Sequence, residues 1–223
     1  MVVNEAMTLW EAERLGLVTF AENVSISEQV MFIPTEDNGL SCGLVTLGDR
    51  VCIRAGAVVC SGVEIGAGTV IGHQCVIRAG VKIGCDSVIS HLVCIERDAQ
   101  VGNRVRISAL THITGGCIIA DDVQIGARVV TVNDNEMRWR DGESLCAPRM
   151  LKGSKIGSGC TLLGHVTIGE GAFIGAGSVV TRDIGANNLA YGNPAYVQGE
   201  APSQGSRAGA SLKGTSSTGG RLS

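Results

Sequence analysis

Aromatic residues are scarce in this sequence: Phe, Trp and Tyr together make up 3% of its 223 residues. The core must therefore consist of small and β-branched side chains rather than large rings. No segment approaches the roughly 18 apolar residues of a membrane-spanning helix, and the N-terminus lacks a basic segment followed by an apolar one. We therefore predict a soluble, cytoplasmic protein without a membrane partner.

An excess of charge of one sign is also missing, because the formal net charge is −3 and both signs are interspersed. Proteins that bind nucleic acid or anionic membranes through electrostatics carry a basic patch. The sequence has no such patch, so no nucleic-acid partner is predicted.

The most prominent feature that the sequence does have is a six-residue repeat. Every sixth residue from Leu47 to Ile125 is aliphatic, and the pattern resumes from Ile156 to Val180. A helix of 3.6 residues per turn cannot keep every sixth residue on one face, whereas six is a multiple of the two-residue strand period. The repeat predicts a single all-β domain of short stacked strands, interrupted over residues 130–155.

The cysteines follow this repeat rather than a disulfide framework. Cys75, Cys117 and Cys160 occupy the fifth position of their hexads, where other hexads have Val, Ala, Ser or Thr. We interpret them as small core residues with reduced thiols, as expected in a cytoplasm.

If the chain winds around so that one turn, or coil, contains three hexads, residues 18 apart in the sequence should lie one above the other at about 4.8 Å. Arg78 then lies beneath Glu96, and a second column contains Asp86, Arg104 and Asp122. The alternating charges support this register, although an exposed ion pair stabilises a fold by only about 0–1 kcal/mol.

The two ends of the chain depart from the repeat. Thr8 to Glu11 has the form of a capping box and Gly16 closes the segment, which predicts a helix over residues 8–15 in an N-terminal lid segment, 1–23. Residues 199–223 are rich in Gly and Ser, so we predict a disordered tail.

Hexads such as Ile65-Gly-Ala-Gly-Thr-Val resemble those of the bacterial hexapeptide-repeat acyltransferases, and the resemblance covers roughly residues 24–198. It implies a left-handed parallel β-helix whose triangular coils contain three hexads each. Nineteen regular hexads, plus an irregular first coil that begins with Val24, Ile26 and Val30, give about seven coils. The resemblance also implies acetyl-CoA as cosubstrate and a homotrimer.

The residues around the interruption indicate which branch of the family the sequence resembles. The segments Asp121-Asp122-Val123, Val130-Thr131-Val132-Asn133-Asp134 and Leu151-Lys152-Gly153 are similar to the branch that acetylates amino groups of nucleotide-linked sugars. This implies an active-site loop, 131–155, that reaches across a trimer interface, with Asn133 and Asp134 facing substrate and thioester.

The loop contains no His, whereas the branch that acetylates hydroxyl groups has a catalytic His in the corresponding loop. A hydroxyl must lose its proton as it attacks, so a base contributes roughly 100- to 10,000-fold. A neutral amine is already a nucleophile and mainly needs placement. An amine acceptor is therefore favoured.

His112, His73 and His91, which lie before the loop, are candidate site residues. His112 takes the sixth position of the hexad beginning at Ile107, a corner that should project outward, and either assists the acceptor or is an ordinary exposed His. His73 and His91 are 18 residues apart and should stack, but the next position is Ala109. Two His without a third ligand hold zinc poorly, so no metal is predicted.

The C-terminal coils carry the cofactor prediction. Ile174 to Asp183, followed by Gly192-Asn193-Pro194-Ala195, resembles the closing coil of the family. Small residues let a narrow pantetheine arm approach the backbone, and an Arg binds phosphate. The resemblance implies contacts to coenzyme A from Gly164, His165, Ala176, Thr181 and Arg182.

The predicted function is acetyl-CoA-dependent N-acetylation of a sugar amino group, on a nucleotide-linked amino sugar or an aminoglycoside-like intermediate. Two alternatives stay open. One is an O-acetyltransferase that uses His112 or His165 as the base, and the other is a non-catalytic β-helix scaffold.

Overall fold

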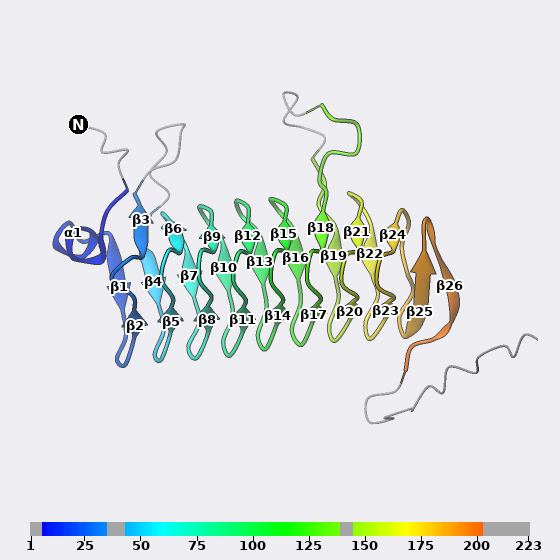
Figure 1. Ribbon diagram of the computed structural model, residues 1–223, viewed down its shortest axis with the longest axis horizontal. Coiled ribbons are helices and arrows are strands. Elements are labelled where there is room, and N and C mark those ends of the chain that lie inside the picture. The colour runs from blue at the N-terminus through cyan, green and yellow to red at the C-terminus, as the bar shows by residue number, and fades with distance from the viewer. Residues whose placement is uncertain (1–5, 35–42, 139–144, 203–223) are drawn as a thin grey trace, which may run out of the picture.

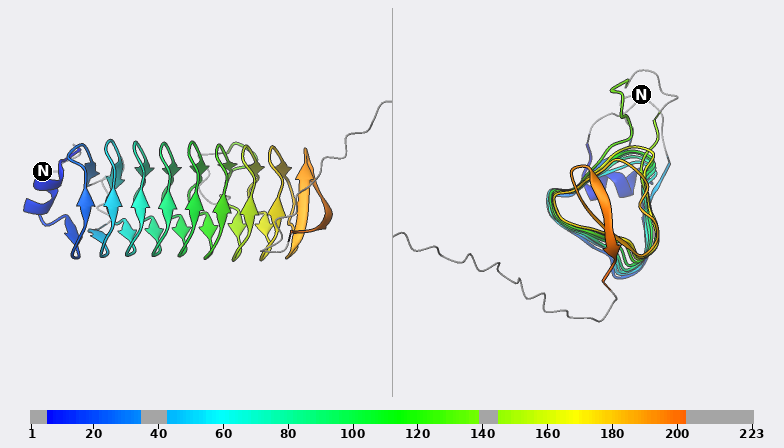
Figure 2. Two further views of the ribbon diagram at one scale, coloured as in Figure 1. Left: turned by 60° about the horizontal axis from the view of Figure 1, so that its bottom comes forward. Right: turned by 90° about the vertical axis from the view of Figure 1, so that its right-hand side faces the viewer.

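The computed structural model describes residues 6–34, 43–138 and 145–202. Three sheets form the sides of a triangular prism, and the chain passes through them in turn as it advances along the prism (Figure 1). The end-on view in Figure 2 shows the triangular outline of the stacked coils. The predicted left-handed parallel β-helix is confirmed.

Each side of the prism is built from short strands that pair in parallel with the strand one coil away. Sheet 1 contains β1 (Val18–Phe20), β4 (Val45–Leu47), β7 (Glu64–Ile65), β10 (Lys82–Ile83), β13 (Gln100–Val101), β16 (Ile118–Ile119), β19 (Arg149–Met150) and β22 (Thr167–Ile168). Sheet 2 contains β2 (Ser25–Ile26), β5 (Cys52–Ile53), β8 (Val70–Ile71), β11 (Val88–Ile89), β14 (Arg106–Ile107), β17 (Gln124–Ile125), β20 (Lys155–Ile156), β23 (Phe173–Ile174), β25 (Asn188–Gly192) and β26 (Ala195–Glu200). Sheet 3 contains β3 (Met31–Ile33), β6 (Val58–Cys60), β9 (Val76–Ile77), β12 (Cys94–Ile95), β15 (His112–Ile113), β18 (Val130–Thr131), β21 (Thr161–Leu162) and β24 (Val179–Val180).

The described residues form eight coils, one more than the predicted count of about seven. The hexad positions left out of that count are Thr131 and Met150, on either side of the interruption. The first coil, β1, β2 and β3, is the irregular one: Val18 of β1 pairs with Val45, 27 residues later, whereas Ile83 pairs with Val101 at the regular spacing of 18. An insertion between β3 and β4 therefore makes this coil irregular.

The repeat forms this fold because each hexad sends one aliphatic side chain inward. Ile53, Ile71, Ile89 and Ile107 follow one another in sheet 2 and are at most 1% exposed. Burying an aliphatic side chain of this size contributes roughly 1.5–3 kcal/mol. Cys75, Cys117 and Cys160 are also fully buried, and none of the eight described cysteines forms a disulfide, which agrees with the interpretation of these three as small core residues.

Both ends of the prism are covered by elements outside the repeat. At the N-terminal end α1 (Leu9–Arg14) begins with the predicted capping box, in which the Thr8 amide donates to Glu11 at 2.8 Å. At the other end β25 and β26 form an antiparallel hairpin. Strand β26 ends two residues beyond the predicted domain end at 198, and most of the predicted tail, residues 203–223, lies outside the described residues.

Two insertions leave the prism at the same edge, where the chain passes from sheet 3 to sheet 1, which we call the 3–1 corner. The first follows β3. The second follows β18, because Ile119 pairs with Met150 at a spacing of 31 residues (Figure 1). Of the predicted loop, residues 139–144 lie outside the described residues. No helix in the described ranges is long and apolar enough to cross a membrane.

Candidate active site

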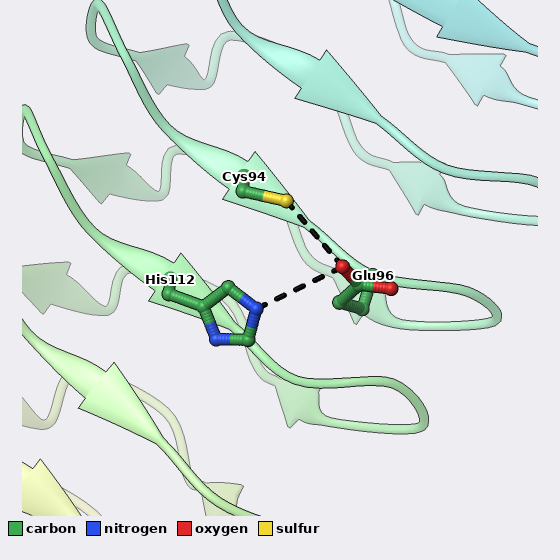
Figure 3. A group of neighbouring side chains, drawn as sticks. All are labelled: Cys94, Glu96 and His112. Carbon is green, nitrogen blue, oxygen red and sulfur yellow. Dashed lines mark hydrogen bonds and ion pairs between the residues drawn. The ribbon is translucent and has the colours of Figure 1, made fainter.

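His112 projects from the outer face of sheet 3, from within β15 rather than from a corner as the sequence suggested. Its strand pairs with β12, so Cys94 lies directly beneath it one coil away. Glu96 follows Cys94 two residues later and points back toward both side chains (Figure 3). The register of the β-helix therefore brings an imidazole, a thiol and a carboxylate together.

One oxygen of Glu96 lies between the other two groups. Glu96 Oε1 is 3.8 Å from His112 Nε2 and accepts a hydrogen bond from the Cys94 thiol at 3.6 Å (Figure 3). The His112 side chain is 44% exposed and that of Glu96 is 29% exposed, so solvent and ligands reach the group. Desolvation, together with the Glu96 charge, raises the pKa of Cys94 to about 11. The thiol is thus protonated at neutral pH and is no nucleophile by itself.

Arg78 holds the second oxygen of the same carboxylate. Its Nη1 donates to Glu96 Oε2 at 3.3 Å, and the two side chains are less than a third exposed. This contact confirms the predicted Arg78–Glu96 column. It also orients Glu96, since one oxygen faces the guanidinium and the other faces His112.

The inserted loop is anchored beside this cluster. Thr131 donates from Oγ1 to the carbonyl of His112 at 3.4 Å, and Asn133 donates from Nδ2 to the carbonyl of Gly115 at 3.2 Å. A Cβ atom at Gly115 would lie 3.8 Å from both Asn133 Nδ2 and the Cβ of Glu96. Asn133 and Glu96 therefore border the same glycine, which brings one predicted catalytic residue to the His112 cluster.

The next loop residues make different contacts. Asp134 accepts a hydrogen bond from the Glu136 amide at 3.2 Å, so one of its carboxylate oxygens closes a local turn. Asn135 pairs with Gly164 through two hydrogen bonds: its Oδ1 accepts from the Gly164 amide at 2.8 Å, and its Nδ2 donates to the Gly164 carbonyl at 3.1 Å. Asn135 thus fixes the loop to the following coil, together with Cys146, whose carbonyl accepts from the His165 amide at 2.9 Å.

Gly164 is needed at this contact. A Cβ atom there would lie 2.7 Å from the carbonyl oxygen of Cys146, so any larger residue would push the returning end of the loop away. Because Asn135 uses both backbone groups of Gly164, a cofactor contact through those groups would require the pairing to open.

The other predicted cofactor residues are exposed but do not all share one edge. His165 and Arg182 lie at the 3–1 corner, after β21 and β24, and Thr181 directly follows β24. The Arg182 guanidinium lies over the ring of Tyr196, 4.9 Å from its centroid. Ala176 lies between β23 and β24, at the opposite edge of sheet 3.

His73 and His91 are also at that opposite edge, both exposed and one coil apart. The amide of Leu92 donates to the carbonyl of His73 at 2.9 Å, which confirms the 18-residue register of this column. Ala109 occupies the next position.

Two residues of the cluster, Cys94 and Glu96, were not identified as site residues from the sequence. The signal was present, since Cys94 precedes His112 by 18 residues and Glu96 had already been placed above Arg78. The column of Cys94 and His112 and the column of Arg78 and Glu96 are two residues apart in the sequence, which indicates that these side chains lie close together.

This arrangement can be compared with known proteins. The sequence profile described as "Bacterial transferase hexapeptide (six repeats)" matches residues 45–79 and 148–182, on both sides of the inserted loop. The chain thus contains hexapeptide repeats similar to those of this family on both sides of the loop.

Curated relatives of this protein match only segments of it. The bifunctional protein GlmU of Rubrobacter xylanophilus is 36% identical over 104 residues, which are 46% of this chain and 21% of GlmU. The dTDP-3-amino-3,6-dideoxy-alpha-D-galactopyranose 3-N-acetyltransferase of Aneurinibacillus thermoaerophilus is 49% identical over 57 residues, 26% of this chain and 30% of that enzyme. The matches thus span less than a third of the length of either relative.

A solved structure resembles this protein over most of its length. LpxA of Bacteroides fragilis, a UDP-N-acetylglucosamine acyltransferase, superimposes with a TM-score of 0.61 and 18% identity. The likeness covers 82% of this chain and 73% of LpxA. At this identity it supports the fold alone.

Proposed function

We propose that this protein is an acetyl-CoA-dependent N-acetyltransferase that acetylates an amino group of a sugar, with a nucleotide-linked amino sugar as the preferred acceptor class. The repeat family and the segment that is 49% identical to a sugar 3-N-acetyltransferase support acyl transfer to such an acceptor. The loop sequence supports it further, because residues 131–155 contain no His.

The choice of an amine over a hydroxyl is carried by the loop without His, and the structural support for acyl transfer is the position of His112 next to Glu96 at the base of the loop. His112 Nε2 and Glu96 Oε1 lie 3.8 Å apart, and they form an ion pair once the imidazole takes up a proton. His112 is therefore equipped to accept the proton that an amine loses when it becomes an amide.

The proposed reaction needs little more than placement and a proton acceptor. The amine nitrogen attacks the thioester carbonyl carbon, a C–N bond forms and the C–S bond breaks. The amine proton passes to His112 and from there to the departing thiolate, with Glu96 stabilising the imidazolium in between. Asn133, held against Gly115, lies where it can orient the acceptor.

Acetyl-CoA would supply the activated acetyl group. Arg182 and Tyr196 form an exposed pair of a cation and an aromatic ring, which suits a phosphate beside a planar base. Thr181 adjoins this pair, and His165 is exposed on the same edge, nearer the loop. Gly164 and Ala176 would contact the pantetheine arm.

We further propose a homotrimer, in which the second insertion covers the acceptor at the boundary between two subunits. The exposed position of His112 on the face of sheet 3 agrees with a site completed by a neighbouring chain. Most soluble homo-oligomers have closed rotational symmetry, as a homotrimer would.

The test uses the full-length protein, acetyl-CoA and three matched nucleotide-linked sugars that carry an amine, a hydroxyl or only hydrogen at one carbon. Mass spectrometry should detect the product, because the exposed Cys85 and Cys146 would react with a thiol reagent. We expect acetylation of the amine only. Acetylation of the hydroxyl alone would instead support O-acetylation.

The O-acetyltransferase alternative has one observation in its favour, which is the carboxylate beside His112, since such a pair also activates a hydroxyl. His165 is a second exposed imidazole that could serve. A protein that acetylates none of the three sugars and shows no heat of acetyl-CoA binding in calorimetry would be a β-helix scaffold.

A further inference from the structure

The cluster of Cys94, Glu96 and His112 offers more than a proton acceptor. It brings together three side chains that can bind a metal. Their ligand atoms all lie within 4.8 Å of one another. We propose that it binds a thiophilic divalent cation of the zinc class through Cys94 Sγ, Glu96 Oε1 and His112 Nε2.

The distances between the donor atoms fit such a cation. Tetrahedral zinc with bonds of about 2.0–2.3 Å separates neighbouring ligand atoms by about 3.4–3.6 Å. The measured separations are 3.6 Å from Cys94 Sγ to Glu96 Oε1 and 3.8 Å from His112 Nε2 to Glu96 Oε1 (Figure 3). The third pair, Cys94 Sγ and His112 Nε2, lies within 4.8 Å, and side-chain rotation would bring these two atoms to the spacing of neighbouring zinc ligands.

The identity of the donors selects the kind of metal. Thiolate and imidazole ligands favour zinc and related transition metals, whereas magnesium and calcium prefer oxygen atoms alone. The metal would take the place of the thiol proton of Cys94. It would bind Glu96 through the oxygen that faces away from Arg78, which holds the other one.

The site has an entry path and an open position. The three side chains project from the outer face of sheet 3 and are partly exposed. Three protein ligands plus one free position are typical of zinc sites that bind water or a substrate atom, rather than closed structural sites. The sequence-based prediction of no metal was based on the His73–His91 column, which does not include these three residues.

The proposal differs from the proposed acyl transfer, although both use His112. A cation on Nε2 prevents that nitrogen from accepting a proton, so metal binding and base catalysis through it exclude each other. Binding is therefore measured without acetyl-CoA or acceptor, and its result does not depend on whether acyl transfer occurs.

The experiment titrates the full-length, reduced and chelator-treated protein with Zn²⁺, Co²⁺ and Mg²⁺. We expect one equivalent of Zn²⁺ per chain by elemental analysis, no Mg²⁺, and a thiolate-to-metal absorption band with Co²⁺. Cys94→Ser and His112→Ala should each weaken Zn²⁺ binding at least about 100-fold, and Cys94→Ser should abolish the Co²⁺ band.

Matched controls are available on the same prism. Cys85→Ser removes an exposed thiol between β10 and β11, and His91→Ala removes an exposed imidazole at the corner before β12, neither of them a proposed ligand. Both should bind Zn²⁺ like the unaltered protein, and thermal unfolding confirms that each variant folds. Absence of stoichiometric binding, or unchanged affinity and Co²⁺ absorption in Cys94→Ser, would overturn the proposal.

Discussion

Two polar clusters on this prism arise from the same 18-residue register but differ in how completely their groups are paired. The first, which we call the arginine cluster, contains Arg104, Asp121 and Asp122. Arg104 binds Asp122 through Nε at 2.6 Å and through Nη2 at 3.0 Å, and it also reaches Asp121 at 3.4 Å. Asn103 donates to the remaining oxygen of Asp121. Every carboxylate oxygen thus has a partner.

The second, the His112 cluster, contains Cys94, Glu96 and His112. Its shared oxygen, Glu96 Oε1, is 3.6 Å from the thiol and 3.8 Å from the imidazole, longer than ordinary strong hydrogen bonds. Fully paired ions stabilise a register, whereas loosely held groups of different chemistry can still bind a ligand or a proton. The contrast separates a structural ladder from a candidate site.

The largest expected effect comes from removing the imidazole. His112→Ala should lower kcat/KM for the amine acceptor about 100-fold, at the lower end for a lost proton acceptor, because a neutral amine attacks without a base. Higher pH should restore part of the rate, since more amine is then neutral. Initial rates by mass spectrometry measure both.

Arg104→Ala is the matched variant for the arginine cluster. It removes a cationic side chain with two carboxylate partners but lies outside the proposed site, so its kcat/KM should remain within about twofold of the unaltered protein. If Arg104→Ala and His112→Ala lose activity equally, the distinction between the two clusters is wrong.

The sequence predicted the parts of the structure that depend on periodicity. The aliphatic position of each hexad is buried, and the pairs Arg78–Glu96 and Arg104–Asp122 lie in contact as the 18-residue offset requires. The capping box of α1 also formed as expected, because its hydrogen bonds join residues three positions apart. Local and strictly periodic features are visible in a sequence.

Features that depend on an insertion or on side-chain rotation were not predicted. Strand β1 of the first coil lies inside the predicted lid segment, 1–23, because the insertion after β3 changes its pairing distance from 18 to 27 residues. The pairing of Asn135 with Gly164 depends on how the loop folds back, and no repeat encodes that. The convergence of Cys94 and His112 on Glu96 requires particular rotamers as well as the register.

A smaller effect is expected from loosening the loop. Asn135→Ala removes two hydrogen bonds to Gly164, and with about 0.5–1.5 kcal/mol for each the loop should open roughly 5- to 100-fold more often. Hydrogen exchange at the His165 amide, which donates to the Cys146 carbonyl of the returning loop at 2.9 Å, reports this opening. Asn103→Ala, which alters the arginine cluster instead, should leave exchange at His165 unchanged. Unchanged exchange in Asn135→Ala would mean that other contacts hold the loop.

The smallest effect tests the arginine cluster itself through pH. The hydrogen bond from Arg104 lowers the pKa of Asp122. A carboxyl group whose pKa is lower in the folded than in the unfolded chain stabilises the fold above its unfolded pKa, near 4, and this stabilisation is lost as the pH falls through the folded value. Thermal unfolding should therefore show Asp122→Asn slightly less stable than the unaltered protein at neutral pH.

The difference between the two proteins should shrink as the medium is acidified, and also in 1 M salt, where the Debye length is about 3 Å. A difference that persists at a pH below the folded pKa of Asp122 would have to come from packing or from the amide of the new side chain. In that case the arginine cluster would not be the charge-based ladder that its contacts indicate, and its contrast with the His112 cluster would rest on geometry alone.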